Sequence, residues 1–539
     1  MRLRRGMTRR EVLRGAGAGM VLGLGGGGLA TRADAAAPDK TLTVGTLLNI
    51  KTLDPGRTLE NATNNVDHAT YDTLVTFWGE DVKVIRPSLA TSWSVSADGR
   101  TYTFTLRPNV KFASGNPFTA ADVKWSLERQ INLKGNGAFL TNGVDAVVAL
   151  DPMTVAIHLD APNPALLPIL TDPALSPIDS KLVTAQGGDA GPDAVTKDKA
   201  EAWLNQHSAG TGPYVLDSYT PNQQLTMVRN PNYWNGSPKL DRIALRQIPV
   251  ASDQAQMVQK GDLDIAMVLG PDQAKSLRNT PGVIVKSALA LNVVDVMMNN
   301  NPQIGGPFSN QKVQQAVRYA LDYDGILALA APGSVRAAGI LPTNLPGARP
   351  TKEVVKADPA HARALLQEAN LADISGNYIF SSTLQSFGID ATLLAQKIQQ
   401  DLSAVGIKLT LQDLPYAVQV QMYRDGKIPF GTGGWIADYS DVSDYLVFLP
   451  GGTVGKRVGW LPGQSKDAQD LVQMGQAAAT AVDPAKRIAL YQNIDRRITE
   501  VGPFVPLFQP AVPYAIRSNI RGVAYTTGWY IDWGSVWKG

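Results

Sequence analysis

Residues 87–129 read PSLATSWSVSADGRTYTFTLRPNVKFASGNPFTAADVKWSLER, and this stretch carries the clearest local structure signals in the chain. At its centre is the turn sequence Ala-Asp-Gly-Arg at 97–100, which precedes a run of alternating apolar and polar residues. The alternation places Tyr102, Phe104 and Leu106 on one face of a strand and threonines on the other. The stretch therefore predicts a β-hairpin with one buried face.

The same stretch ends in a predicted helix, and strands and helices alternate in the chain that follows. Thr119 is followed three residues later by Asp122, which is the pattern of a helix N-terminus. Farther on, the pattern predicts a strand at 242–249 and a helix at 252–260, which Gly261 ends. Such alternation is typical of an open α/β sheet.

The composition is that of a large globular protein. The chain has 539 residues, of which 44% are hydrophobic and 18% charged, so length alone predicts about three domains. It contains no cysteine, which excludes disulfides and thiolate metal sites. Its four histidines, His68, His158, His207 and His361, are not at metal-ligand spacing. We therefore expect neither a metal site nor a cofactor.

The first 37 residues form a predicted signal peptide. Arg9 and Arg10 lie in the sequence Thr-Arg-Arg-Glu-Val-Leu-Arg at 8–14, which resembles the twin-arginine export motif. The run at 15–30 is rich in glycine, alanine and leucine, but it is too weakly apolar to span a membrane well. We expect cleavage near Ala35 and export by the twin-arginine machinery.

The chain without this signal is slightly acidic. Residues 1–37 carry seven arginines and two acids, so the remainder has a formal charge of −2 in place of +3. We therefore do not expect nucleic acid or an anionic membrane as a partner. Because there is no cysteine to carry a lipid anchor, we expect a soluble, monomeric protein in the periplasm.

A candidate binding stretch at 430–448 reads FGTGGWIADYSDVSDYLVF. It sets Asp438, Asp441 and Asp444 three residues apart among aromatic side chains, behind a run of glycines. Carboxylates beside flat rings can hold a cation in a partly dry pocket, and glycines let a backbone approach a ligand. The same pattern also fits a loop whose tryptophan packs in the core and whose acids face water.

Five strings, in order along the chain, carry a resemblance to a known family. They are the opening stretch at 87–129, GTGPYVLDSYTPNQQLTMVRNPNYW (210–234), SNQKVQQAVRYALDYDGIL (309–327), GWIADYSD (434–441) and RIALYQNIDRRITEVGPFVPLF (487–508). Together they resemble solute-binding protein family 5, the large extracytoplasmic binding proteins of peptide-, nickel- and opine-type ATP-binding-cassette importers. The resemblance covers essentially the whole chain after residue 37.

The resemblance implies an α/β, two-lobed, periplasmic-binding-protein-like fold of type II, in its three-domain variant with discontinuous domains. The two crossings between the lobes, near Leu289 and Leu507, would form a hinge, and the ligand would lie between the lobes. The expected boundaries are 38–72, 209–288 and 508–539 for domain I, 73–208 for domain II and 289–507 for domain III.

The resemblance also implies a function and a site. The protein would be the periplasmic substrate-binding component of an importer, which captures a small solute and delivers it to a membrane permease. The solute would be a peptide or peptide-like, or an opine or oligosaccharide. In peptide-binding members, an aspartate three residues after a glycine–tryptophan pair holds the ligand's ammonium group, and Asp438 stands there after Gly434-Trp435. Trp435 and Tyr439 would line the cleft, and Gly434 would let the backbone meet the ligand.

Three further expectations follow. Lys397 is the only cation between 381 and 400, where dipeptide binders place an arginine for the ligand carboxylate. Asp441 and Asp444 should be solvated or should cap nearby backbone. We expect no enzyme, because the chain after residue 37 has neither a Gly-x-Ser-x-Gly elbow nor a phosphate-binding loop. The alternatives are a periplasmic hydrolase that uses paired carboxylates in the cleft, and an export chaperone or sensor partner.

Overall fold

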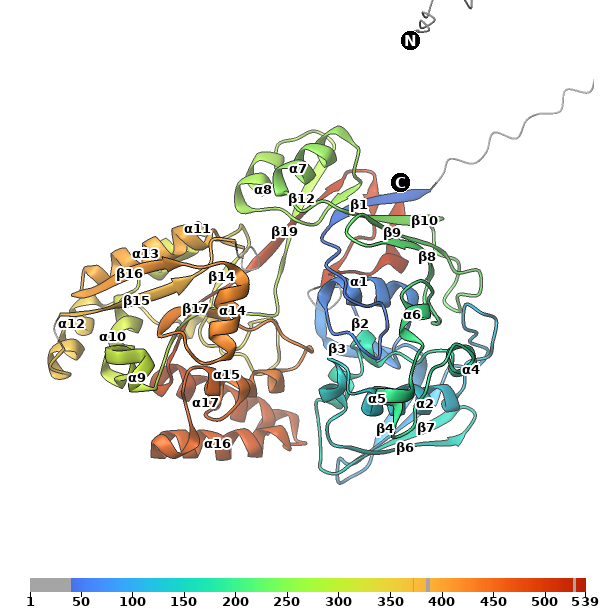
Figure 1. The fold of residues 1–539 in the computed structure, drawn as a ribbon, viewed down its shortest axis with the longest axis horizontal. Helices are drawn as coiled ribbons and strands as arrows, with labels where there is room; N and C mark the ends of the chain where they lie inside the picture. The colour runs from blue at the N-terminus through green and yellow to red at the C-terminus, as the bar shows by residue number, and fades with distance from the viewer. Residues whose placement is uncertain (1–39, 372, 384–387, 527–529) are drawn as a thin grey trace, which may run out of the picture. The chain divides into compact units, whose positions relative to one another are not determined.

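The computed structural model describes residues 40–371, 373–383, 388–526 and 530–539. The predicted signal peptide, with Arg9 and Arg10, lies outside the described residues. Residues 40–539 group into one unit that mixes helices and strands throughout (Figure 1).

One large sheet takes its seven strands from three separate parts of the sequence. In spatial order they are β12 (Val283–Leu289), β19 (Ala511–Arg517), β11 (Ile265–Ala266), β1 (Thr41–Thr46), β10 (Arg242–Gln247), β9 (Gln224–Arg229) and β8 (Tyr214–Thr220). Strand β1 is parallel to both of its neighbours, β10 and β11, and the other pairs are antiparallel. The C-terminal part of the chain thus returns, as β19, to the sheet that the N-terminal part begins.

A second large sheet has six strands. In spatial order they are β14 (Val335–Arg336), β18 (Phe504–Gln509), β13 (Val294–Met298), β17 (Phe430–Gly434), β15 (Ile374–Phe380) and β16 (Ile407–Asp413). Successive side chains of a strand point to opposite faces. In β13 this sends Val294, Val296 and Met298 into one hydrophobic core and Met297 into another, so both faces of the sheet are covered.

Helices supply the two cores that cover this sheet (Figure 1). The core on one face contains α10 (Gln311–Ala320), α11 (Tyr323–Leu329), α12 (Pro359–Glu368) and α13 (Ala391–Ser403). The core on the other face contains η5 (Val442–Phe448), α15 (Thr453–Arg457), α16 (Lys466–Ala479) and α17 (Pro484–Val501), with α14 (Tyr416–Arg424) packed against it.

The hairpin predicted from 87–129 belongs to a four-stranded antiparallel sheet, and the predicted helix follows it in the chain. The strands of this sheet are β4 (Ala90–Val95), β5 (Thr101–Leu106), β7 (Thr154–Leu159) and β6 (Val144–Asp151). Tyr102, Phe104 and Leu106 are buried, as predicted. Helix α2 (Ala120–Leu133) begins after Thr119, whose N and Oγ1 each donate to an Asp122 carboxylate oxygen at 2.9 Å. Both predictions are confirmed.

The remaining elements are short, apart from two ten-residue helices. The strands form three pairs: β2 (Val75–Trp78) with β3 (Asp81–Pro87), β20 (Ile520–Arg521) with β23 (Trp537–Lys538), and β21 (Tyr525–Thr526) with β22 (Tyr530–Ile531). The helices are α1 (Asn61–Thr70), α3 (Leu166–Ile169), α4 (Ser180–Ala185), α5 (Ala194–Lys197), α6 (Glu201–Leu204), α7 (Ala251–Lys260), α8 (Pro271–Leu277) and α9 (Pro302–Gly305). Gly261 ends α7 at a φ of 90°, which confirms the predicted helix end.

Two adjacent connections join the large sheets. One leads from β12 to β13, and the other is a single residue, Pro510, between β18 and β19. Ala290 N donates to Pro510 O at 2.9 Å, and the buried Gln509 side chain donates to Ala290 O at 2.7 Å. Below, the first lobe means residues 40–290 and 510–539, and the second lobe means residues 291–509. The domain boundaries and the hinge near Leu289 and Leu507 stay predictions.

Candidate functional site

A cavity of about 1210 Å³ is lined by both lobes. The first lobe contributes the loop after β1, the start of α1, residues 171–173 and the starts of α7 and α8. The second lobe contributes Leu291 and Asn292, the end of α11, the start of α13 and residues 436–440. The candidate binding stretch therefore reaches this cavity from the second lobe.

Asp438 is held in the cavity wall by its backbone. The neighbouring Ala437 N donates to Leu291 O at 3.1 Å, and Asp438 N donates to Asp444 Oδ2 at 3.2 Å. The Asp438 side chain is half-buried and lines the cavity, and no described residue donates a hydrogen bond to its carboxylate. Burial raises the pKa of Asp438 to about 6. This carboxylate is fixed in place, partly desolvated and available to a ligand.

The other two acids of the stretch have structural partners. Asp441 accepts hydrogen bonds from Arg487 at 2.6 and 3.0 Å, and it caps η5 by accepting from Ser443 N at 2.8 Å. Asp444 is buried and accepts from Trp435 Nε1 at 2.5 Å. The expectation is that these acids are solvated or cap nearby backbone. Neither is solvated, because both are buried, but both bind nearby backbone: Asp441 caps η5, and Asp444 accepts from Asp438 N at 3.2 Å.

Of the four predicted ligand-binding residues, the structure brings two to the cavity. Asp438 and Tyr439 line it, whereas Gly434 and Trp435 are not among its lining residues. The Trp435 ring packs against the core under η5, and Gly434 pairs with Val294 inside the six-stranded sheet. Tyr439 also packs against the core of the four-stranded sheet, so it connects the two lobes.

The glycine run in front of this stretch has a packing reason. A Cβ at Gly431 would lie 2.5 Å from Ile379 O, and a Cβ at Gly433 would lie 2.5 Å from Asp295 Oδ1. Both distances are far inside van der Waals contact, so β17 fits between its neighbours only with glycine at these positions. At these two positions the glycines allow close sheet packing.

Sequence reasoning missed the residues on the facing wall of the cavity. Asn64 on α1 and Asp172 before η2 (Pro173–Leu175) both line the cavity and are more than nine-tenths buried. Asn64 Nδ2 donates to Asp172 Oδ2 at 3.5 Å, and Asp172 Oδ1 accepts from Ala174 N at 2.8 Å. The sequence signals were the polar run at 61–65, which suggested a ligand-sized loop, and the Asp172-Pro173 pair, which is typical of a helix start.

The pKa of Asp172 links the two walls. Burial raises this pKa to about 7, the hydrogen bond from Ala174 lowers it, and the charge of Asp438 raises it further. The two carboxylates therefore lie close enough to repel each other across the cavity.

The cavity has an excess of negative charge. Five carboxylates line it, those of Glu60, Asp172, Asp272, Asp390 and Asp438. The cations among its described lining residues are two lysines, Lys51 and Lys275, and Lys51 is paired with Glu60 at 2.8 Å. Lys397 is not among them, because it pairs with Asp322 and Asp401 at 2.8 and 2.7 Å.

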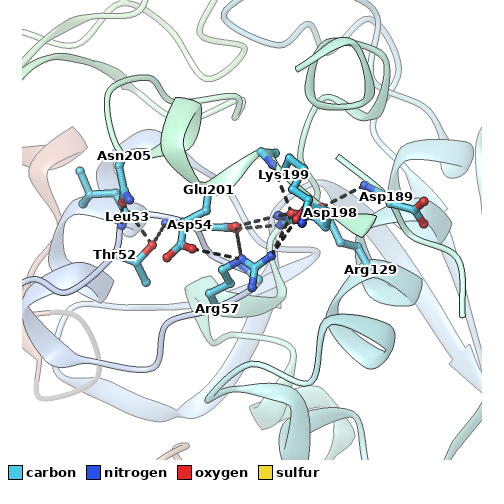
Figure 2. A network of polar contacts seen from close by, with 12 residues as sticks. Thr52, Leu53, Asp54, Arg57, Arg129, Asp189, Asp198, Lys199, Glu201 and Asn205 are labelled. Atoms are coloured by element: carbon cyan, nitrogen blue, oxygen red, sulfur yellow. Dashed lines mark hydrogen bonds and ion pairs between the residues drawn. The ribbon is translucent and has the colours of Figure 1, made fainter. Parts of the chain in front are cut away.

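Buried ion pairs support the first-lobe wall (Figure 2). Arg129 is 1% exposed and donates to both carboxylate oxygens of Asp54 at 2.7 Å. It also donates to Asp198 through Nε at 2.8 Å and Nη2 at 3.0 Å, and Arg57 reaches the same carboxylate at 3.1 Å. Asp54 and Arg57 belong to the loop between β1 and α1, whose two ends line the cavity, so this network fixes that loop.

The model of the family described as bacterial extracellular solute-binding proteins, family 5, middle region, matches residues 84–456. The chain belongs to this family. The glutathione-binding protein GsiB of Salmonella typhi is 30% identical, over 92% of this chain and 94% of its own. The probable D,D-dipeptide-binding periplasmic protein DdpA of Escherichia coli is 26% identical, over 92% of this chain and 93% of its own.

Solved structures of the family share the fold. The ATP-binding-cassette transporter substrate-binding protein CtaP of Listeria monocytogenes has a TM-score of 0.81 at 19% identity, covering 93% of this chain and 99% of its own. NikA of Brucella suis, in complex with Fe(III)-EDTA, has a TM-score of 0.77 at 23% identity, covering 93% and 100%. The expected α/β fold of periplasmic binding proteins is confirmed. Within the described part of the chain, no helix combines the length and apolar character that a membrane span requires.

Proposed function

We propose that this protein is the periplasmic substrate-binding component of an ATP-binding-cassette importer, which captures a small peptide-like solute and delivers it to the permease. The cavity lined by both lobes is the observation that carries this proposal. Its volume of about 1210 Å³ exceeds the ~300–1000 Å³ of ordinary small-molecule pockets, which suits an extended solute of several residues' length. One relative is named a probable D,D-dipeptide-binding protein and another a glutathione-binding protein, and both names agree with such a solute.

Asp438 holds the ligand's ammonium group in this proposal. Its carboxylate is oriented by the backbone contacts of Ala437 and Asp438 and receives no hydrogen bond from a described residue. A cation that enters the partly dry cavity would form a charge-assisted hydrogen bond there, which is stronger than the same bond in water. Leu393 and Ile436 expose apolar surface in the same cavity and provide contacts for an apolar part of the solute.

Closure of the lobes on the solute would use the two adjacent connections. Ala290 and Pro510 are joined by a hydrogen bond, so the connections would move together while the sheets on either side stay rigid.

A thermal-shift screen of the purified mature protein tests the binding function. The panel contains dipeptides, tripeptides, oligosaccharides, opine-like compounds and metal chelates, and each hit is followed by calorimetry. A ligand at a hundred times its dissociation constant should add about 2.7 kcal/mol to the free energy of unfolding. Stoichiometric binding with the ligand recovered intact supports the proposal. Chemical conversion of a ligand during incubation would instead support the hydrolase that uses paired carboxylates.

A further inference from the structure

The described residues of the walls that face each other near Asp438 offer acceptors and no counter-charge. From the first lobe come Asn64 and Asp172, and from the second lobe comes Asp438. Behind Asp172 lies the buried Asp67 on α1. Burial raises the pKa of Asp67 most, and the charges of Asp54 and Asp172 raise it further. Among the described residues, no cation is close enough to lower the pKa of Asp172 or Asp438.

The Asn64 side chain shows which kind of group the site lacks. Its Nδ2 is directed at Asp172 Oδ2, a carboxylate acceptor, and this fixes the orientation of the amide. Its Oδ1 is buried and accepts a hydrogen bond from no described residue. A buried acceptor without a donor costs free energy, so this oxygen needs a donor that the described protein does not supply. The missing group is therefore a hydrogen-bond donor.

We propose that Asp438, Asp172 and Asn64 together form one acceptor site for an ammonium group, so that the cation connects the two lobes. The proposal rests on the proposed function and names its solute class: amine-bearing, peptide-like solutes with a net positive charge. An ammonium group has three N–H donors, and the site offers one acceptor side chain for each.

Charge explains why this site selects against other solutes. Asp172 and Asp438 repel each other across the cavity, and a cation between them removes that repulsion when the lobes close on it. A zwitterionic peptide also brings a carboxylate into a cavity that already has five carboxylates against two lysines. An uncharged or anionic solute leaves Asp172 and Asp438 unneutralised in the partly dry cavity, which disfavours its closed complex.

Three forms of one tripeptide test this proposal by calorimetry at pH 7, where the peptide α-amino group is mostly protonated. They are trialanine amide, which is cationic, trialanine, which is zwitterionic, and N-acetyltrialanine, which is anionic. We expect the amide to bind ~10-fold or more tightly than trialanine, and the acetylated form not to bind, because it lacks the ammonium group. Equal affinity for all three forms would overturn this proposal and leave the proposed function standing. Failure of all three to bind would overturn this proposal, and the wider ligand panel would then decide the proposed function separately.

Substitutions test whether Asp172, on the first-lobe wall, contributes to the affinity for the cationic peptide. Asp172→Asn keeps a side chain that caps η2 but removes the charge, and it should weaken binding of trialanine amide ~10-fold or more. The matched control is Asp262→Asn, an exposed carboxylate that follows α7 and does not line the cavity, and it should change affinity less than about twofold. Equal effects of the two substitutions would refute a specific role for Asp172.

A double-mutant cycle tests whether one ammonium group contacts both carboxylates or whether each carboxylate acts on the ligand only through its charge. If one ammonium group touches both carboxylates, the effects of Asp172→Asn and Asp438→Asn are coupled and the double variant loses less than their product. Strictly multiplicative losses would mean that the two carboxylates act on the ligand independently, and the single shared site would be wrong. Melting of each apo variant confirms that it is folded.

Discussion

Replacing Asp438 by asparagine should remove affinity for an ammonium-bearing solute without harming the apo protein. The substitution keeps the shape of the side chain and leaves the backbone bonds of Ala437 and Asp438 in place. It changes only the carboxylate, to which no described residue donates a hydrogen bond. Any loss of affinity therefore reports on the ligand.

The size of the loss follows from the position of Asp438 in the cavity. Two unit charges 4 Å apart attract by about 4 kcal/mol at the effective dielectric constant of about 20 that suits partly buried sites. Part of this is offset by desolvation, and truncating one partner of such a pair typically costs about 2–5 kcal/mol. We therefore expect Asp438→Asn to raise the dissociation constant roughly 30-fold or more.

The apo protein should respond in the opposite direction. Burial raises the pKa of Asp438 to about 6, above its value in the unfolded chain, so the ionised carboxylate destabilises the fold increasingly from about pH 4 to pH 6. At pH 8 the destabilisation is complete, and asparagine removes it together with the repulsion from Asp172 and Asp444. The melting temperature of the apo variant should stay the same or rise.

Calorimetry and melting of three asparagine variants form the assay. Asp441→Asn weakens the ion pair with Arg487 and should lower the melting temperature, with little effect on affinity. Asp444→Asn retains an oxygen for the Trp435 indole and should also largely spare affinity. Small, equal effects on affinity at all three positions would refute the ammonium assignment. A destabilised apo protein with unchanged affinity in Asp438→Asn would show that Asp438 only organises its loop.

Three other predictions concern folding, pH and export. Arg129→Gln should lower the free energy of unfolding by about 3–5 kcal/mol in urea titrations, because it removes the buried cation from two buried aspartates and leaves them with the more exposed Arg57; a loss below about 1 kcal/mol would contradict this. Affinity for trialanine amide should rise as pH increases through about 6 to 7, because the cation binds the ionised forms of Asp438 and Asp172, and fall above about pH 8, where the ligand's ammonium group loses its proton; constant affinity in calorimetry over this range would contradict the idea. Replacing Arg9 and Arg10 together by lysine should leave precursor in the cytoplasm, and normal periplasmic accumulation in cell fractions would indicate another export route.

Local sequence patterns predicted the elements whose cause is local. The hairpin depends on the turn residues at 97–100, and the helix start depends on Thr119 and Asp122, three positions apart. Both signals are therefore visible in the sequence alone. Five ordered strings were also enough to predict the family and its fold. Residues 436–440 of the candidate stretch line the cavity, and they include Asp438, which follows a family pattern; its role in binding stays a prediction.

Long-range contacts decided the parts that the sequence left open. Asp438, Asp441 and Asp444 look equivalent in the sequence, but each acquires a different environment from partners that other elements bring. Arg487 on α17 pairs with Asp441, the Trp435 indole binds Asp444, and Asp438 is left facing the cavity. Spacing cannot reveal this, because the donors arrive through tertiary packing.

The first-lobe wall shows most clearly the difference between what local sequence predicts and what long-range contacts decide. The polar run at 61–65 suggests a ligand-sized loop in the sequence, but it forms the start of a helix, and Asp172 simply precedes a proline. Asn64 and Asp172 become part of a site only because the first lobe places them opposite Asp438 of the second lobe. The sequence by itself determined the local elements and the family. Tertiary structure decided which carboxylates are neutralised within the protein and which remain for a solute, because burial and charge pairing depend on residues far apart in the chain.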